Sequence, residues 1–130
     1  MKRDPEIVRQ LLLKAADRDE AIILVADIAT SEEERYHLHL LNEISFIRVF
    51  DQSGNSYIGG SALELSRFAG ATMSVASAGH DYLDAIRDEG IWQKTKEGAA
   101  KMGGVTLGIM KDIAVVYMKE AAAEKLGITL

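Results

Sequence analysis

The residues best suited to chemistry are a histidine–aspartate pair and two further histidines. His80 and Asp81 are adjacent, as in the His-Asp pair of metal-dependent phosphohydrolases, and His37 and His39 could add ligands. A catalytic metal needs several His and carboxylate groups that converge from packed helices. Residues two apart on a helix point to different faces, and the chain holds three histidines in all. We therefore expect no metal site, with Asp81 favouring a helix start and His80 in a polar, half-buried position.

Other catalytic patterns are weaker still. Asp84 and Asp88 are four residues apart, a spacing that suits acid–base work on one helix face and equally a solvated face. Gly59-Gly60 and Gly103-Gly104 match no phosphate-binding pattern and are typical of turns. The absence of cysteine excludes disulfides and thiolate chemistry. We expect a protein without enzymatic activity, catalytic residues or cofactors.

Five side chains could contact double-stranded DNA. Arginine and asparagine can pair with guanine and adenine edges, and the helix predicted to open at Ser31 presents such residues on its outward face. The candidates are Arg35, His39 and Asn42 on that helix, and Arg48 and Arg67 on the strand and ribbon that follow. Against this hypothesis, Glu32, Glu33 and Glu34 begin the same helix and would repel phosphates.

The charge distribution leaves a second hypothesis open. The net charge is −5, and residues 1–90 carry 9 basic and 16 acidic side chains, whereas residues 91–130 carry 6 and 4. The acidic turn Glu32–Glu34 and the negative first 90 residues suit a basic protein partner, including one that normally holds nucleic acid. The chain is therefore either a DNA-binding or transcription-regulatory protein of bacterial or prophage type, or a protein–protein interaction module such as a phage-encoded modulator of a host or defence protein.

Helix and strand signals place these residues. Asp4 followed by Pro5 predicts a helix start, and apolar residues at helical spacing continue to about Asp17. Strands are expected at 22–25 and 46–50, with a turn at 51–55 and weaker strand candidates at 57–58, 62–68 and 72–76. Between the first two strands, Ser31 and Glu34 have capping-box spacing. The predicted buried centre line of that helix runs through His37, Leu41 and Ile44.

The C-terminal third is predicted to be helical. Ser77 caps a helix to about Asp88, a second helix covers 91–102, and Thr106 caps a third that ends at Gly127. Trp92 is expected to be a core anchor. The last helix carries an apolar stripe wide enough to predict a homodimer, unless both flanks pack inside the monomer. The residues expected at that interface are Ile109, Ile113, Val116 and Tyr117.

The order helix, strand, helix, strand, glycine-broken ribbon, strand and helices is that of a winged helix. Such a domain normally has two helices between its first and second strands, and residues 26–45 leave little room for the extra one. We predict an α+β fold: a winged-helix-like domain with a shortened helix-turn-helix, a β-ribbon wing and extra C-terminal helices.

Several segments resemble a known family. They are Met1–Asp4, Tyr36–Leu41, Ala78–Arg87, Ile91-Trp92, Thr95–Gly98 and Gly103-Gly104. They resemble domain-of-unknown-function family 2513, small proteins of bacteria and prophages similar to the YjcQ-like winged-helix proteins. The segment Gly79–Arg87 is the specific part. The chain departs from the family at Ser45, where glycine is usual, and at Ala76-Ser77, where threonine and tryptophan are usual.

The domain organisation follows. The resemblance spans nearly the whole chain, so we expect one domain over 1–130, with a winged-helix body at 1–90 and a helical extension at 91–130. No apolar run approaches the roughly 20 residues that span a bilayer, and the charged start is unlike a signal peptide. We therefore expect a cytoplasmic protein with no membrane contact.

Overall fold

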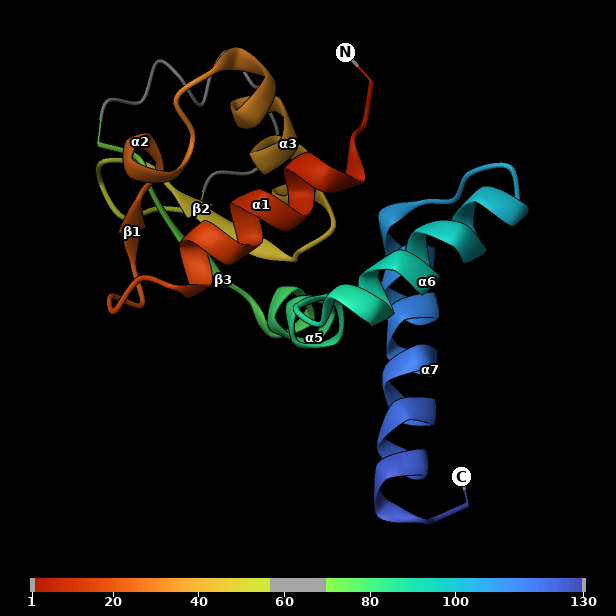
Figure 1. Cartoon of the computed structure of the whole chain (residues 1–130). Coiled ribbons are helices and arrows are strands. Elements are labelled where there is room, and N and C mark those ends of the chain that lie inside the picture. The colour runs from red at the N-terminus through yellow and green to blue at the C-terminus, as the bar shows by residue number, and fades with distance from the viewer. Residues whose placement is uncertain (1, 57–69, 130) are drawn as a thin grey trace. The chain divides into compact units, whose positions relative to one another are not determined.

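A computed structural model describes residues 2–56 and 70–129 (Figure 1). Within these ranges it contains six helices and one three-stranded antiparallel sheet, so the fold class is α+β. The chain divides into two compact units, Met1–His80 and Asp81–Leu130, here called unit 1 and unit 2. The predicted strands at 57–58 and 62–68 lie outside the described residues, as does Arg67. In the described part, no helix has the length and apolar character required to cross a membrane.

Unit 1 begins with helix α1 (Pro5–Ala16), as predicted. The Asp4 carboxylate caps it by accepting a 2.9 Å hydrogen bond from the amide of Glu6, and Pro5 occupies the first turn. Its buried apolar face consists of Val8, Leu11, Leu12 and Ala15. Through this face α1 packs on the sheet and on the helix that precedes the second strand.

The sheet is formed by β1 (Ile23–Leu24), β2 (Ile47–Phe50) and β3 (Thr72–Val75), in the order β1-β3-β2. The register places Ile23 and Val49 on either side of Met73, and all three are buried. Arg48, between Ile47 and Val49, is exposed, because successive side chains of a strand point to opposite faces. The central strand is therefore the last in sequence.

Two helices, rather than one, connect β1 to β2. The short α2 (Val25–Ile28) follows β1 directly and buries its first and last side chains. The sequence left little room for it, and the prediction of a single helix here is wrong because four residues are enough for one turn. The longer α3 (Glu32–Glu43) begins as predicted at Ser31, whose hydroxyl accepts a hydrogen bond from the amide of Glu34.

Helix α5 (Ser77–Ile86) includes the division between the units, and unit 2 continues with α6 (Glu89–Lys101) and α7 (Leu107–Leu126). Thr106 caps α7, and Gly127 ends it in the left-handed conformation with φ 65°, both as predicted. Helices α6 and α7 pack together over a shared core. Its buried members are Trp92, Thr95, Ala99, Leu107, Met110 and Ala114. The C-terminal half of α7 extends past α6 (Figure 1).

Candidate protein-interaction surface

An open groove of about 530 Å³ lies in unit 1, between α1 and the first turn of α3. Its residues come from both helices: Glu6, Ile7, Gln10 and Lys14 from α1, and Ser31, Glu33 and Glu34 from the start of α3. On α1, three of them recur every fourth residue and so share one helix face. We call this feature the acidic groove, because three of its lining residues are glutamates.

The Lys14–Glu34 ion pair joins the two sides of the acidic groove. The Lys14 ammonium donates a 3.0 Å hydrogen bond to Glu34, and the other carboxylate oxygen of Glu34 accepts from the amide and hydroxyl of Thr30. Partial burial raises the pKa of Glu34, but these hydrogen bonds outweigh it and lower that pKa from 4.5 to about 2. Glu34 is therefore ionised at neutral pH, and the charge of Lys14 is neutralised within the groove.

Glu33 is the exposed acid of this groove. Its carboxylate forms no ion pair in the part of the chain that the structure describes, and neither does that of Glu32 beside it. Both lie in the first turn of α3, where negative charge is stabilised by the helix dipole. The acidic groove therefore presents negative charge over the apolar side chain of Ile7.

The predicted outward face of α3 is partly wrong. Arg35, His39 and Asn42 are half-buried rather than exposed, and Ile44 is exposed, because the buried centre line runs through His37, Leu38 and Leu41. The amide of Asn42 also faces the sheet: its oxygen accepts a 3.2 Å hydrogen bond from the backbone of Val49. The exposed residues that remain on α3 include Glu32, Glu33 and Glu43.

The candidate DNA-contacting residues do not form one exposed basic surface. The His39 imidazole lies 2.6 Å from the Glu43 carboxylate, and the Nε of Arg35 is buried with no hydrogen-bond partner among residues 2–56 and 70–129. Arg48 alone among the described candidates is exposed, on β2. Arg67 lies outside the described residues.

The structure also shows the surroundings of the residues that the sequence offered as catalytic or metal-binding candidates. His80 is exposed, so the expected half-buried position is wrong, and Asp81 and Asp84 are exposed as well. Asp88 caps α6 by accepting a 2.9 Å hydrogen bond from the amide of Ile91. No group of three His, Cys, Asp or Glu residues within 2–56 and 70–129 is arranged to hold a metal ion.

The four residues predicted at a dimer interface separate into two pairs. Ile113 and Tyr117 face α6: a β-carbon added to Gly98 would lie 3.4 Å from Ile113 and 3.5 Å from the Tyr117 hydroxyl. Ile109 and Val116 are exposed. Trp92 is buried, as predicted, and the Lys96 ammonium lies 5.4 Å from its ring centre, in a cation–π contact.

The family model described as "Hypothetical protein (DUF2513)" matches residues 2–106. The chain belongs to domain-of-unknown-function family 2513. This family 2513 protein is 30% identical over 128 residues to a Haemophilus influenzae protein named "Uncharacterized protein", an alignment that covers 95% of the chain and 100% of that relative. No solved structure matches the chain.

The sequence pointed to one side of the acidic groove only. The run Glu32–Glu34 was recognised as a surface for a basic partner, but the face of α1 that carries Glu6, Gln10 and Lys14 was missed. Its signal was present, because these residues have four-residue spacing on the polar side of an amphipathic helix. Which other helix this face meets is a tertiary property, so the groove in this family 2513 protein could not be derived from spacing.

Proposed function

We propose that this protein is a non-enzymatic, cytoplasmic interaction module that binds a basic segment of a protein partner in the acidic groove. The observation that carries this proposal is the pairing of Lys14 with Glu34, which neutralises the basic side chain beside the exposed carboxylate of Glu33. A lysine or arginine of the partner can place its apolar stem against Ile7 and its charge near Glu33.

The same proposal gives unit 1 a winged-helix fold. In the described part of unit 1, three helices and three strands follow one another as helix, strand, helix, helix, strand, strand, and the last strand lies between the other two. In that arrangement α3 takes the position of the recognition helix. Its exposed acids support a protein partner, because a DNA reader draws much of its affinity from basic contacts with phosphates.

DNA binding is the competing proposal, and the exposed Arg48 on β2 favours it. A strand that leads into the ribbon of a winged helix is suitably placed for a phosphate contact. DNA binding of this kind would weaken steeply as salt is raised. We expect instead no retardation of duplex DNA at low salt, and an Arg48→Glu variant that behaves like the wild type.

A photo-crosslinking experiment tests the acidic groove directly. A photoreactive amino acid replaces Gln10, which lines the groove and is exposed. The tagged protein is irradiated in bacterial lysate, and crosslinked peptides are identified by mass spectrometry. We expect one reproducible partner, joined through a segment rich in lysine or arginine, with a yield that falls at high salt.

Glu33→Lys and Glu32→Lys form a matched pair for this experiment. Both place a lysine in the first turn of α3 and so disturb the helix dipole alike, but only Glu33 lines the groove. We expect Glu33→Lys to reduce the yield of crosslinked partner about tenfold, which is equivalent to about 1.4 kcal/mol of binding free energy. Glu32→Lys is expected to retain most of the wild-type yield. Equal yields from the two variants would contradict the proposal, as would retardation of DNA that Arg48→Glu abolishes.

A further inference from the structure

The C-terminal half of α7 exposes apolar side chains. Val116 is 54% exposed and Leu126 70%, and no residue of α7 after Ala114 is buried. Ile109, on the same side near the start of the helix, is 41% exposed. Ile109 and Val116, seven residues apart, share one face of the helix, and exposed apolar side chains on one face are typical of an interaction surface.

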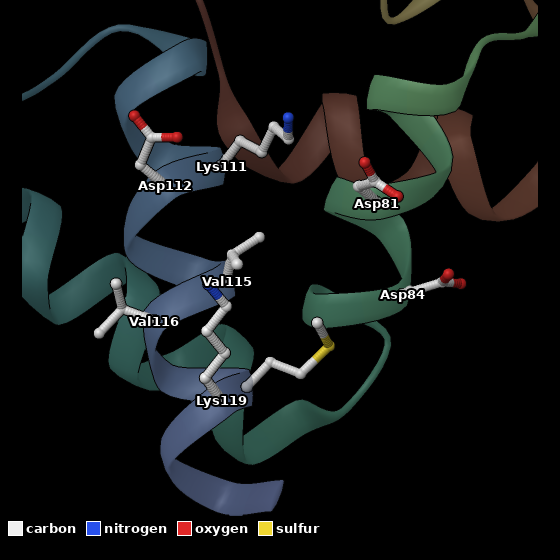
Figure 2. Close-up of a pocket in the computed structure, with 8 residues that line it drawn as sticks. Asp81, Asp84, Lys111, Asp112, Val115, Val116 and Lys119 are labelled. Atoms are coloured by element: carbon white, nitrogen blue, oxygen red, sulfur yellow. The ribbon is translucent and has the colours of Figure 1, made fainter. Parts of the chain in front are cut away.

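A groove of about 490 Å³ lies beside this face, wholly within unit 2. Figure 2 shows Asp81 and Asp84 on α5 across from Lys111, Val115 and Lys119 on α7. Asp112, Val116 and Met118 complete the lining. The groove therefore joins a short apolar surface to charged side chains from both helices.

The charges of α7 have an order that fits a reversed copy of the same helix. Lys111-Asp112 and Lys119-Glu120 stand on either side of Val115-Val116, and each pair places the base before the acid. In an antiparallel pair centred between Val115 and Val116, Asp112 lies opposite Lys119 of the partner subunit. Lys111 and Glu120, nine residues apart, project from opposite sides of the helix, so Asp112 and Lys119 form the pair that meets across the axis. A parallel pair in register would place like charges opposite one another, which is unfavourable.

These charges are available for such contacts. Within residues 70–129, none of the four forms an ion pair in the single chain. Asp112 and Lys119 are exposed and lie at the level of the groove. Opposite charges that meet across an interface select orientation and register more than they add affinity.

We propose that a second copy of this chain occupies the exposed face of α7, with the two α7 helices antiparallel in a symmetric dimer. A two-fold interface uses the same patch of both subunits, so one self-complementary helix is sufficient. Val115 and Val116 lie at the two-fold axis, and Ile109, on the same face as Val116, extends the apolar contact towards the start of the helix. This inference stands apart from the acidic groove, which belongs to unit 1.

Engineered cysteines test the orientation, because the chain has no native cysteine. A disulfide requires α-carbons within about 7 Å. Two copies of Val116→Cys meet that requirement near the axis. Two copies of Ile109→Cys lie about 20 Å apart along the antiparallel helices, given a rise of about 1.5 Å per residue. We expect rapid oxidation to a covalent dimer for Val116→Cys and none for Ile109→Cys on non-reducing gels.

Charge variants test the pairing by light scattering and sedimentation of the full chain. Asp112→Lys is expected to raise the dimer dissociation constant about tenfold, because lysines then face one another across the axis. The double variant Asp112→Lys/Lys119→Asp restores opposite charges and is expected to return the constant to near the wild-type value. Glu33→Lys, in unit 1, is the control and is expected to leave the measured mass of the dimer unchanged. Circular dichroism checks that each variant folds.

Three results would overturn the proposal. The first is a monomeric mass for the wild type at tens of micromolar. The second is a dimer that crosslinks through Ile109→Cys as readily as through Val116→Cys, since that pattern requires parallel helices. The third is a dimer dissociation constant for the double charge variant that is as high as the constant for Asp112→Lys alone.

Discussion

The backbone amide of Asp4 donates a 2.8 Å hydrogen bond to Nε2 of His37, whose side chain is fully buried in α3. Since Nε2 is the acceptor, the proton is on Nδ1, which donates to the carbonyl of Glu33 at 2.7 Å. The imidazole therefore connects the residue that caps α1 to the first turn of α3. It holds together the two helices that form the acidic groove.

Replacing this histidine should destabilise unit 1. His37→Leu fills a similar volume but leaves the Asp4 amide without its acceptor, which costs about 1–3 kcal/mol. The free energy of unfolding in urea measures the loss, and hydrogen exchange at the Asp4 amide should accelerate. His80→Ala is the control, since His80 is exposed and its removal should change stability by less than about 0.5 kcal/mol. Equal effects of the two substitutions would contradict the role assigned to His37.

Glu34 should make stability depend on pH in the acid range. Its pKa is about 2 in the folded protein, against 4.5 without these contacts, so its contribution is fully present above pH 4.5. That contribution is lost as the pH falls from 4.5 towards 2. Glu34→Gln should therefore lower the free energy of unfolding by about 1 kcal/mol at pH 7, a value reduced for solvent screening of the exposed Lys14. The difference between variant and wild type should vanish near pH 2, and a constant difference would refute this prediction.

Gly79 should tolerate no side chain. A β-carbon at this position of α5 would lie 2.1 Å from the carbonyl oxygen of Phe46, which is backbone and cannot turn away. Gly79→Ala should cost about 3 kcal/mol or more by overpacking, measured by thermal and urea unfolding. Gly108→Ala, in α7, meets nothing closer than 3.8 Å and should leave stability unchanged or raise it by up to about 1 kcal/mol. The contrast gives a physical reason for the glycine at the start of the segment Gly79–Arg87.

Ser45→Gly should stabilise the protein. Ser45 has φ 61°, and it ends α3 in a Schellman motif: the amide of Phe46 donates to the carbonyl of Leu41, and the amide of Ser45 to that of Asn42. A left-handed residue with a β-carbon costs about 1–2 kcal/mol, part of which glycine recovers. We expect a gain of up to about 1 kcal/mol in unfolding free energy. Ser45→Val, which is β-branched, should lose stability, and a loss with glycine would argue against strain at this position.

Local signals were sufficient for the helix ends. Asp4, Ser31 and Thr106 cap the helices that follow them, and Gly127 ends α7, each as the sequence predicts. These interactions join residues two to four positions apart, so the order of residue types along the chain determines them. The strands at 47–50 and 72–75 were also predicted closely, because alternating or β-branched residues lie next to clear turn residues.

Tertiary structure decided which faces are used. Residue spacing placed Arg35, His39 and Asn42 on the outward face of α3, but in the structure all three are half-buried. Asn42 accepts a hydrogen bond from Val49 of the returning strand β2. The acidic groove depends on Lys14 meeting Glu34, twenty residues further along the chain, and the contact of Asp4 with His37 spans thirty-three. The sequence by itself determined the helix ends and two of the strands, because those depend on near neighbours. Only the packing of α1 on α3 decided the candidate site, because spacing gives the faces of a helix but not the neighbour that each face meets.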